Sequence, residues 1–173
     1  MTRSTKKVGP QRYRETFGRY FAAFEVGDVY EHRPGKTITE YENHLFTLLT
    51  LNTHPLHFDA EFGKATEFGQ NLVVSTYTLS LLIGMSVTDI SHKAIANLGL
   101  DDVKFPSPVF VGDTLYAESE VLAKRESKSR PGQGIVTVRT AGHNQDGVEI
   151  CSFVRNVLIP AEGRAVEDRM ETY

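Results

Sequence analysis

The amino-acid sequence predicts an α+β fold in which a curled antiparallel sheet wraps around one long central helix. The helix is predicted over residues 70–86, an almost uninterrupted apolar stretch that is too long for a typical strand. The sheet is predicted from the alternation of apolar and polar residues that dominates the chain after residue 97. A sheet curled around the helix is the simplest way to bury this apolar stretch.

The composition is typical of a single soluble globular domain. The chain has 173 residues and a mass of 19.3 kDa, with 40% hydrophobic and 24% charged residues. A formal net charge of −3 argues against a nucleic-acid-binding protein, because such proteins usually carry a basic surface. The one cysteine, Cys151, is expected to be a small buried hydrophobic residue and not part of an intrachain disulfide. No run reaches the roughly 18 apolar residues of a membrane span, and no signal peptide is evident, so we expect a cytoplasmic protein without membrane contact.

Three segments are predicted: a basic N-terminal arm over residues 1–24, a domain over residues 25–160 and a C-terminal tail over residues 161–173. The arm has six basic residues opposed by one acidic residue, and such charge blocks are usually solvated. We expect a partly disordered arm whose aromatic second half docks onto the domain. Its basic residues are Arg3, Lys6, Lys7, Arg12, Arg14 and Arg19.

The domain is expected to begin with a strand and a capped helix. Residues 26–32 are typical of a short strand, and Pro34-Gly35 predicts a turn after it. Thr39 and Glu42 fit a capping box at the start of a helix, which should end before Pro55 because proline disfavours helical geometry in the preceding residue.

The second half of the domain is expected to consist of strands joined by turns. The run after Gly112-Asp113 alternates over residues 115–123 and leads into a charged loop. A further alternating run precedes Asn144-Gln145-Asp146-Gly147, which is a hairpin turn signal, and the chain returns over residues 148–159.

Three polar residues lie where the first helix breaks: Asn52, His54 and His57. The unperturbed pKa of histidine, about 6.5, suits it to general acid–base catalysis. The alternative is that these side chains only bond the loose backbone groups of the broken helix. A metal site is less favoured, because only Asp59 lies nearby as a further ligand and no Cys/His/carboxylate set completes it.

Two motifs resemble those of the MaoC-like, (R)-specific enoyl-CoA hydratase family. Residues 52–59, Asn-Thr-His-Pro-Leu-His-Phe-Asp, resemble the family motif Asp-x-Asn-Pro-[aliphatic]-His, which is often followed by Asp. Residues 105–115, Phe-Pro-Ser-Pro-Val-Phe-Val-Gly-Asp-Thr-Leu, resemble the family's Phe-x-x-Pro-Val-[aromatic]-x-Gly-Asp-x-[aliphatic]. The apolar helix lies between them, as in the family, and the resemblance covers roughly residues 25–160.

This resemblance implies a hot-dog fold, in which an antiparallel sheet wraps a long helix and the domains pair into homodimers or higher homo-oligomers. It also implies an activity, because family members add water reversibly across the double bond of a 2-enoyl-CoA. A backbone N–H at the start of the central helix polarises the thioester carbonyl. No metal or redox cofactor is implied, and coenzyme A enters only as part of the substrate.

The resemblance also assigns roles to single residues. His57 matches the motif histidine and is the candidate general acid–base. Asn52 stands where the family has aspartate, and an amide orients water but takes no proton. His54 stands where the family has asparagine and is a candidate for substrate binding. Two interpretations stay open: His57 acts as the sole base, or the chemistry is lost and the domain only binds acyl-CoA.

The helix start departs from the family as well. Family members have His-Gly there, and the corresponding pair in this sequence is taken to be Asn71-Leu72. The N–H of Leu72 is therefore the predicted donor to the thioester oxygen. For Asn71, a helix cap and a substrate contact are equally favoured.

The sequence thus predicts an acyl-CoA hydratase or dehydratase. A short branched or dicarboxylic acyl group, such as mesaconyl- or itaconyl-CoA, would suit the polar replacements at Asn52 and His54. Two alternatives remain, an acyl-CoA thioesterase with the same fold and a non-catalytic acyl-CoA-binding domain.

Overall fold

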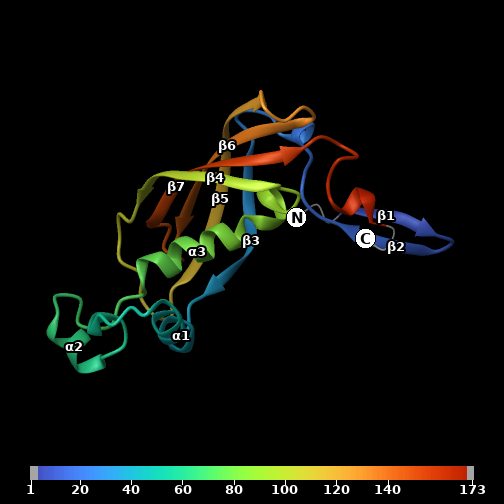
Figure 1. Ribbon diagram of the computed structural model, residues 1–173. Helices are drawn as coiled ribbons and strands as arrows, with labels where there is room; N and C mark the ends of the chain where they lie inside the picture. Colours follow the sequence, from blue (N-terminus) through green and yellow to red (C-terminus); the bar gives the residue numbers. More distant parts are fainter. Residues whose placement is uncertain (1–3, 171–173) are drawn as a thin grey trace.

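The structure, a computed structural model, describes residues 4–170 and contains a five-stranded sheet with one helix packed against it (Figure 1). The strand order is β3-β5-β6-β7-β4, and each neighbouring pair is antiparallel. The helix on the sheet is α3 (Ser75–Met85). This arrangement confirms the predicted α+β architecture. The strands are β3 (Val29–Thr37), β4 (Ala96–Lys104), β5 (Thr114–Glu126), β6 (Gln133–His143) and β7 (Glu149–Pro160).

The hydrophobic core lies between α3 and the sheet. Leu82 of α3 is fully buried, and a Cβ atom at Gly142 of β6 would lie 2.4 Å from its Cδ1 atom. Glycine is therefore needed at this position for the helix to approach the sheet. Cys151 is fully buried, as predicted. Burial of this apolar surface fixes α3 on the sheet and so fixes the position of its N-terminal end.

The central helix begins later than predicted, at Ser75 and not at residue 70. Leu72 instead forms a β-bridge with Phe110, and the N–H of Val73 donates to the oxygen of Val109 at 2.9 Å. The N–H of Val73 therefore has its partner in this strand-like pairing and needs none within a helix. None of the described helices, α3 included, is long and apolar enough to cross a membrane.

The dipeptide Pro34-Gly35 forms no turn, contrary to the prediction. β3 continues through it to Thr37, with a shift in its pairing to β5 between His32 and Lys36. β3 lies at the edge of the sheet, where a proline interrupts no inner ladder. Gly35 is required for packing, because a Cβ atom there would lie 2.5 Å from the Tyr116 ring.

The predicted capping box is present at the start of α1 (Glu40–Thr50). The N–H of Thr39 donates to the Glu42 carboxylate at 2.9 Å, and the N–H of Glu42 donates to the Thr39 hydroxyl at 3.4 Å. Hydrogen bonds from Lys36 and Thr39 lower the pKa of Glu42 to about 2. The buried residues of α1 are polar, namely Asn43 and Thr47, whereas its leucines are exposed.

A small lobe lies at the N-terminal end of α3, beyond the sheet (Figure 1). It contains α1, the 3₁₀ turn η2 (Pro55–His57) and the short helix α2 (Ala60–Ala65). Asp59 caps α2, because its carboxylate accepts from the N–H groups of Glu61 and Phe62. The histidines of the predicted site belong to this lobe.

The N-terminal arm is more regular than predicted. β1 (Ser4–Gly9) and β2 (Arg12–Thr16) form a hairpin that projects from the domain near the C-terminal end of α3 (Figure 1). The predicted docking of the second half is confirmed, since η1 (Phe21–Ala23) leads into Phe24, which is fully buried. Arg3, a basic residue of the predicted arm, lies outside the described residues. In the predicted tail, η4 (Glu167–Arg169) precedes residues 171–173, which also lie outside them.

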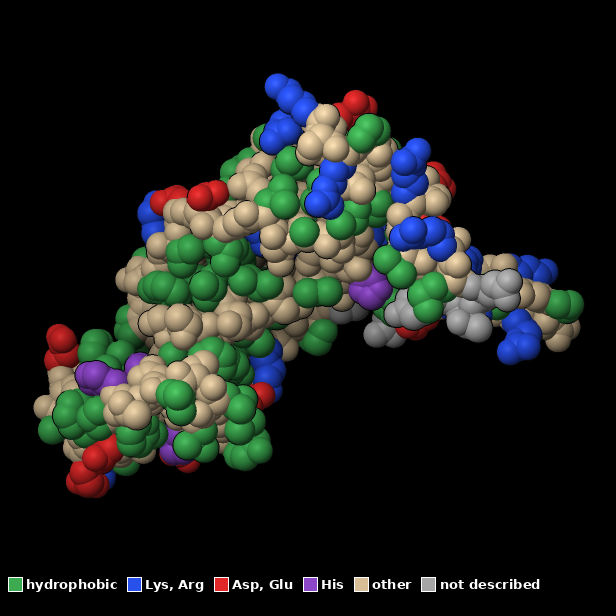
Figure 2. Space-filling model, in the orientation of Figure 1, with side chains coloured by type: hydrophobic (Ala, Val, Ile, Leu, Met, Phe, Trp, Pro, Cys, Tyr) green, Lys and Arg blue, Asp and Glu red, His purple; other side chains and the backbone are tan. Residues whose placement is uncertain are grey.

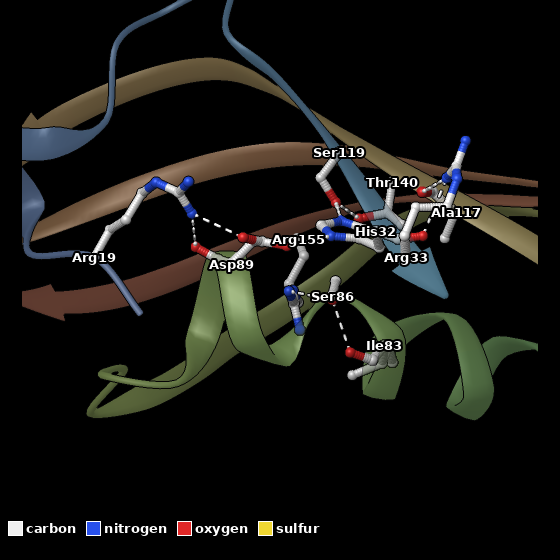
Figure 3. A network of polar contacts seen from close by, with 10 residues as sticks. All are labelled: Arg19, His32, Arg33, Ile83, Ser86, Asp89, Ala117, Ser119, Thr140 and Arg155. Carbon is white, nitrogen blue, oxygen red and sulfur yellow. Dashed lines mark hydrogen bonds and ion pairs between the residues drawn. The ribbon is translucent and has the colours of Figure 1, made fainter. Parts of the chain in front are cut away.

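A chain of polar contacts lies between the sheet and the C-terminal end of α3 with the segment that follows it (Figure 3). The Nδ1 atom of His32 lies 3.1 Å from the Asp89 carboxylate, and Nε2 lies 2.8 Å from the Ser119 hydroxyl. Arg19 donates to Asp89 at 3.1 Å, which ties the arm to the domain. The order Asp89, His32, Ser119 is that of a catalytic triad, but Ser119 is fully buried, so its hydroxyl is closed to a substrate.

Arg155 of β7 lies beside this network and is also fully buried (Figure 3). Its Nη2 group donates to the Ser86 hydroxyl at 2.9 Å, while Nε and Nη1 have no hydrogen-bond partner within residues 4–170. Burial lowers the pKa of Arg155 to about 10. Burial also lowers the pKa of His32, despite the opposing effect of Asp89, so the neutral imidazole is favoured in the folded protein.

The substitution His32→Gln tests this network. Because the pKa of His32 is lower in the folded than in the unfolded state, the unfolded chain binds more protons below pH 6.5, and wild-type stability rises with pH. We expect the variant to lose about 1–3 kcal/mol of unfolding free energy at pH 7.5. The loss should shrink as the pH falls from 6.5 to 5.

Denaturant unfolding at a series of pH values measures both quantities. The core variant Val138→Ala is the control, because it removes buried carbon atoms and no titratable group. Its stability loss should not change across the same pH range. A loss for His32→Gln that grows on acidification would contradict the assignment of a neutral buried imidazole.

Candidate active site

A helix break places the three polar side chains selected from the sequence on one loop. Leu51, which follows α1, adopts a φ of 55° in the left-handed region, so the chain turns sharply there. Asn52, His54 and His57 follow within six positions, and η2 begins with a proline, whose fixed φ favours the first position of a helical turn. In Figure 2, histidine side chains emerge among hydrophobic side chains on this lobe.

The ring of His57 is held by a backbone carbonyl. Its Nδ1 atom lies 3.0 Å from the oxygen of Leu72, which precedes α3. A carbonyl oxygen only accepts, so Nδ1 carries the hydrogen and Nε2 of the neutral ring carries a lone pair. The side chain is half-buried, and Nε2 has no hydrogen-bond partner within the described residues. This arrangement leaves Nε2 free to take a proton.

His54 has the opposite tautomer. Its Nδ1 atom accepts from the N–H of Leu56 at 3.2 Å, so the hydrogen of the neutral ring resides on Nε2. The ring centroids of His54 and His57 are 6.0 Å apart, and His54 is exposed. The loop thus presents a proton acceptor and a hydrogen-bond donor side by side.

Asn52 stabilises the same loop. Its Oδ1 atom accepts from the N–H of His54 at 3.2 Å. The contacts of the described residues connect Asn52 to the His54 backbone and not to the His57 ring. The side-chain NH₂ group of Asn52 has no partner among those residues and can donate to a water molecule.

Asn71 holds the loop from the opposite side. Its side-chain NH₂ group donates to the oxygens of Leu56 at 2.8 Å and Asp59 at 2.9 Å. Asn71 is therefore not the predicted helix cap, because α3 begins four residues later and the amide is occupied by the loop. A Cβ atom at Gly63 of α2 would lie 2.8 Å from the Asn71 nitrogen, so α2 packs closely on this residue.

The predicted donor role of the Leu72 N–H is wrong. This N–H donates to the oxygen of Leu56 at 3.2 Å, so it is not free for a thioester. The first-turn N–H groups of α3 belong to Ser75 and Thr76, and neither has a partner in residues 4–170. The sequence motifs predict neither group as a donor, although the β-branched pair Val73-Val74 favours extended backbone just before them.

Comparisons with known proteins place the chain in a family. The family model for mesaconyl-CoA hydratase matches residues 8–171. The chain belongs to the mesaconyl-CoA hydratase family. A mesaconyl-CoA hydratase from Cereibacter sphaeroides is 37% identical over 82% of this chain and 41% of that protein. An (R)-specific enoyl-CoA hydratase from Aeromonas caviae is 34% identical over 72% of this chain and 87% of that protein. The resemblance to (R)-specific enoyl-CoA hydratases is thereby confirmed.

Solved structures confirm the hot-dog fold. A MaoC-like dehydratase from Rhodospirillum rubrum superposes with a TM-score of 0.74 at 26% identity, covering 84% of this chain and 99% of that one. A Mycobacterium tuberculosis protein described as a double hotdog fold gives 0.78 at 25% identity, covering 86% of this chain and 47% of that one. The chain spans about two fifths of the length of the mesaconyl-CoA hydratases that it matches.

The described residues of this loop do not assemble a metal site. In residues 4–170, no group of three or more His, Cys, Asp or Glu side chains is placed to hold a metal ion. Asp59, the further ligand considered from the sequence, instead caps α2 through its carboxylate.

A groove of about 550 Å³ runs along α3 on the side of β3. Tyr77, in the first turn of α3, lines the groove, and its ring packs against Phe46 with centroids 5.3 Å apart. The groove therefore reaches the first turn of α3 at Tyr77. Its other lining residues are Arg33, Pro34, Lys36, Ser80, Leu81, Gly84, Met85 and Thr88.

The two histidine tautomers are directly measurable. At pH 8, long-range ¹H–¹⁵N correlation spectra should show His57 protonated at Nδ1, because Leu72 accepts there, and His54 protonated at Nε2, because Leu56 donates to Nδ1. Single His→Gln variants assign the signals. Observation of His57 with its hydrogen on Nε2 would exclude that nitrogen as the base.

Proposed function

We propose that this chain adds water reversibly across the double bond of a 2-enoyl-CoA, as a hydro-lyase of the enoyl-CoA hydratase kind. The observation that carries the proposal is the hydrogen bond from His57 Nδ1 to Leu72, which leaves Nε2 as a free base. The names and identities of the matched hydratases support it.

The proposed reaction proceeds by proton transfer alone. Nε2 of His57 takes a proton from a water molecule while the water oxygen bonds to C3. The electrons of the double bond shift toward the thioester, and negative charge gathers on its carbonyl oxygen. The N–H groups of Ser75 and Thr76, at the positive end of α3, stabilise that charge. The protonated His57 then delivers its proton to C2, which completes the addition of one water.

This scheme accounts for the amide at position 52. In the family motif, an aspartate stands beside the histidine, but here the Leu72 carbonyl fixes the orientation and tautomer of His57. His57 therefore acts as the sole base, and the NH₂ group of Asn52 holds the attacking water. Neither a metal ion nor a redox cofactor enters the scheme, and coenzyme A is part of the substrate.

We further propose a short branched or dicarboxylic acyl group as the substrate, such as mesaconyl- or itaconyl-CoA. The name of the matched hydratases supports the mesaconyl group. The exposed Nε2–H of His54, beside the base, is a suitable donor to a carboxylate of the acyl group.

A homodimer or higher homo-oligomer is proposed as the working form, with a second copy beside β4. β4 is an edge strand whose Leu98, Leu100 and Val103 side chains are exposed, and such edges are usually covered. The lengths of the matched relatives support a second unit, since this chain covers 47% of the double hotdog protein. A cytoplasmic location stays a prediction.

The substitution His57→Gln tests the proposed function. We expect kcat for hydration to fall about 10²–10⁴-fold, because the base that takes the proton from water is removed. The assay follows the loss of enoyl-thioester absorbance across short, long, branched and carboxylated enoyl-CoAs, with free thiol measured in parallel. His143→Gln, on β6 and outside the loop, is the matched control and should keep wild-type kcat.

Three outcomes would contradict the proposal. Unchanged turnover in His57→Gln removes His57 as the base. Release of free thiol identifies a thioesterase, because hydration leaves the thioester intact. Saturable binding without an absorbance change identifies a non-catalytic acyl-CoA-binding domain.

A further inference from the structure

A buried amide in α1 contacts both parts of the candidate active site, the loop that carries His57 and the segment that leads into α3. Asn43 is fully buried, although it belongs to a helix whose leucines face outward. Burying a side-chain amide is unfavourable unless its polar atoms are hydrogen-bonded. The contacts of Asn43 therefore show what this side chain holds together.

Among the described residues, the side chain of Asn43 makes three hydrogen bonds, all to backbone groups of the site. Its NH₂ group donates to the oxygen of His57 at 2.9 Å and to the oxygen of Leu72 at 3.2 Å. Its Oδ1 atom accepts from the N–H of Val74 at 3.0 Å. The side-chain amide of Asn43 thus bonds to the backbone of His57, which carries the proposed base, and to the Leu72 oxygen, which orients the His57 ring. It also bonds to Val74, the residue before α3.

These contacts fix the base relative to the helix. The Leu72 oxygen accepts from both Asn43 and the His57 ring, so Asn43 also holds the atom that orients the ring. The bond to Val74 holds that residue in an extended conformation, with φ −62° and ψ 125°, immediately before Ser75. The helix therefore starts with the N–H groups of Ser75 and Thr76 free.

We propose that Asn43 is a positioning residue of the hydration reaction, which sets His57 Nε2 at a fixed place relative to the first-turn N–H groups of α3. The inference rests on the proposed function and extends it to a residue that touches neither water nor substrate. A shift of about 1 Å in the position of the base relative to the N–H groups that stabilise the oxyanion is enough to lower the reaction rate strongly.

Thr47 provides a matched comparison. It is buried on the same helix, one turn after Asn43, but its hydroxyl donates to the oxygen of His44 within α1 at 2.6 Å. Thr47→Val therefore removes a buried hydrogen bond of α1 without touching the contacts that hold His57 and Val74.

The test compares Asn43→Asp with Asn43→Gln and Thr47→Val. Asn43→Asp keeps the shape and the acceptor for Val74 but loses both donors, and Asn43→Gln keeps the amide but displaces it by one methylene. We expect both to lower kcat about 10–100-fold with KM changed less than about threefold. Thr47→Val should keep kcat within about twofold of wild type, even if its melting temperature falls.

A second readout is independent of activity. In Asn43→Asp, ¹⁵N spectra should show the His57 ring as a mixture of tautomers, because the Leu72 oxygen is no longer held in place. If wild type lacks hydratase activity but this spectral change occurs, the proposed function fails and the positioning role stands.

Three results would overturn the inference. A folded Asn43→Asp with wild-type kcat and an unchanged His57 spectrum leaves Asn43 without a positioning role. An equal loss of kcat in Thr47→Val shows that any weakening of α1 has the same effect. Failure of both Asn43 variants to fold assigns this residue to the structure alone.

Discussion

The hydrogen bond between His57 and Leu72 joins a loop to a segment fifteen residues further along the chain. It sets the tautomer of the imidazole, and the tautomer determines which nitrogen can act as a base. In the motif of (R)-specific hydratases an aspartate accompanies the histidine, whereas here a backbone carbonyl makes the orienting contact. The chemistry assigned to the loop depends on this one acceptor, and the acceptor depends on the extended conformation of the residues before α3.

That conformation is maintained from two sides. Val73 is paired with Val109, which anchors the segment to the chain leading into β5, and Asn43 bonds to it from α1. The sheet and α3 supply the apolar burial that keeps these elements in place. The lobe of α1 and α2 contributes little apolar packing of its own, since its buried face is polar. Polar contacts with backbone groups therefore determine the geometry of the site, while apolar packing determines where the site lies.

Local signals in the sequence predicted much of this fold. The Thr39–Glu42 capping box, the apolar central helix and the alternating strands are properties of short segments, and the structure confirms them. The prediction failed where long-range pairing prevails over local preference. Pro34-Gly35 stays within an edge strand because β5 pairs with the residues before and after the dipeptide. Leu72 is not helical because it pairs with Phe110. The motif located His57 on its loop, but the orienting carbonyl and the Asn43 amide carry no motif, since each acts through contacts distant in sequence.

A crystal structure of the protein with a 3-hydroxyacyl-CoA product tests the central claim most directly. The account requires the 3-hydroxyl oxygen to lie within hydrogen-bonding distance of His57 Nε2, about 2.6–3.2 Å. It also requires the thioester oxygen to face the N–H groups of Ser75 and Thr76. A product bound along the groove between β3 and α3, with its hydroxyl group remote from His57, would contradict the account.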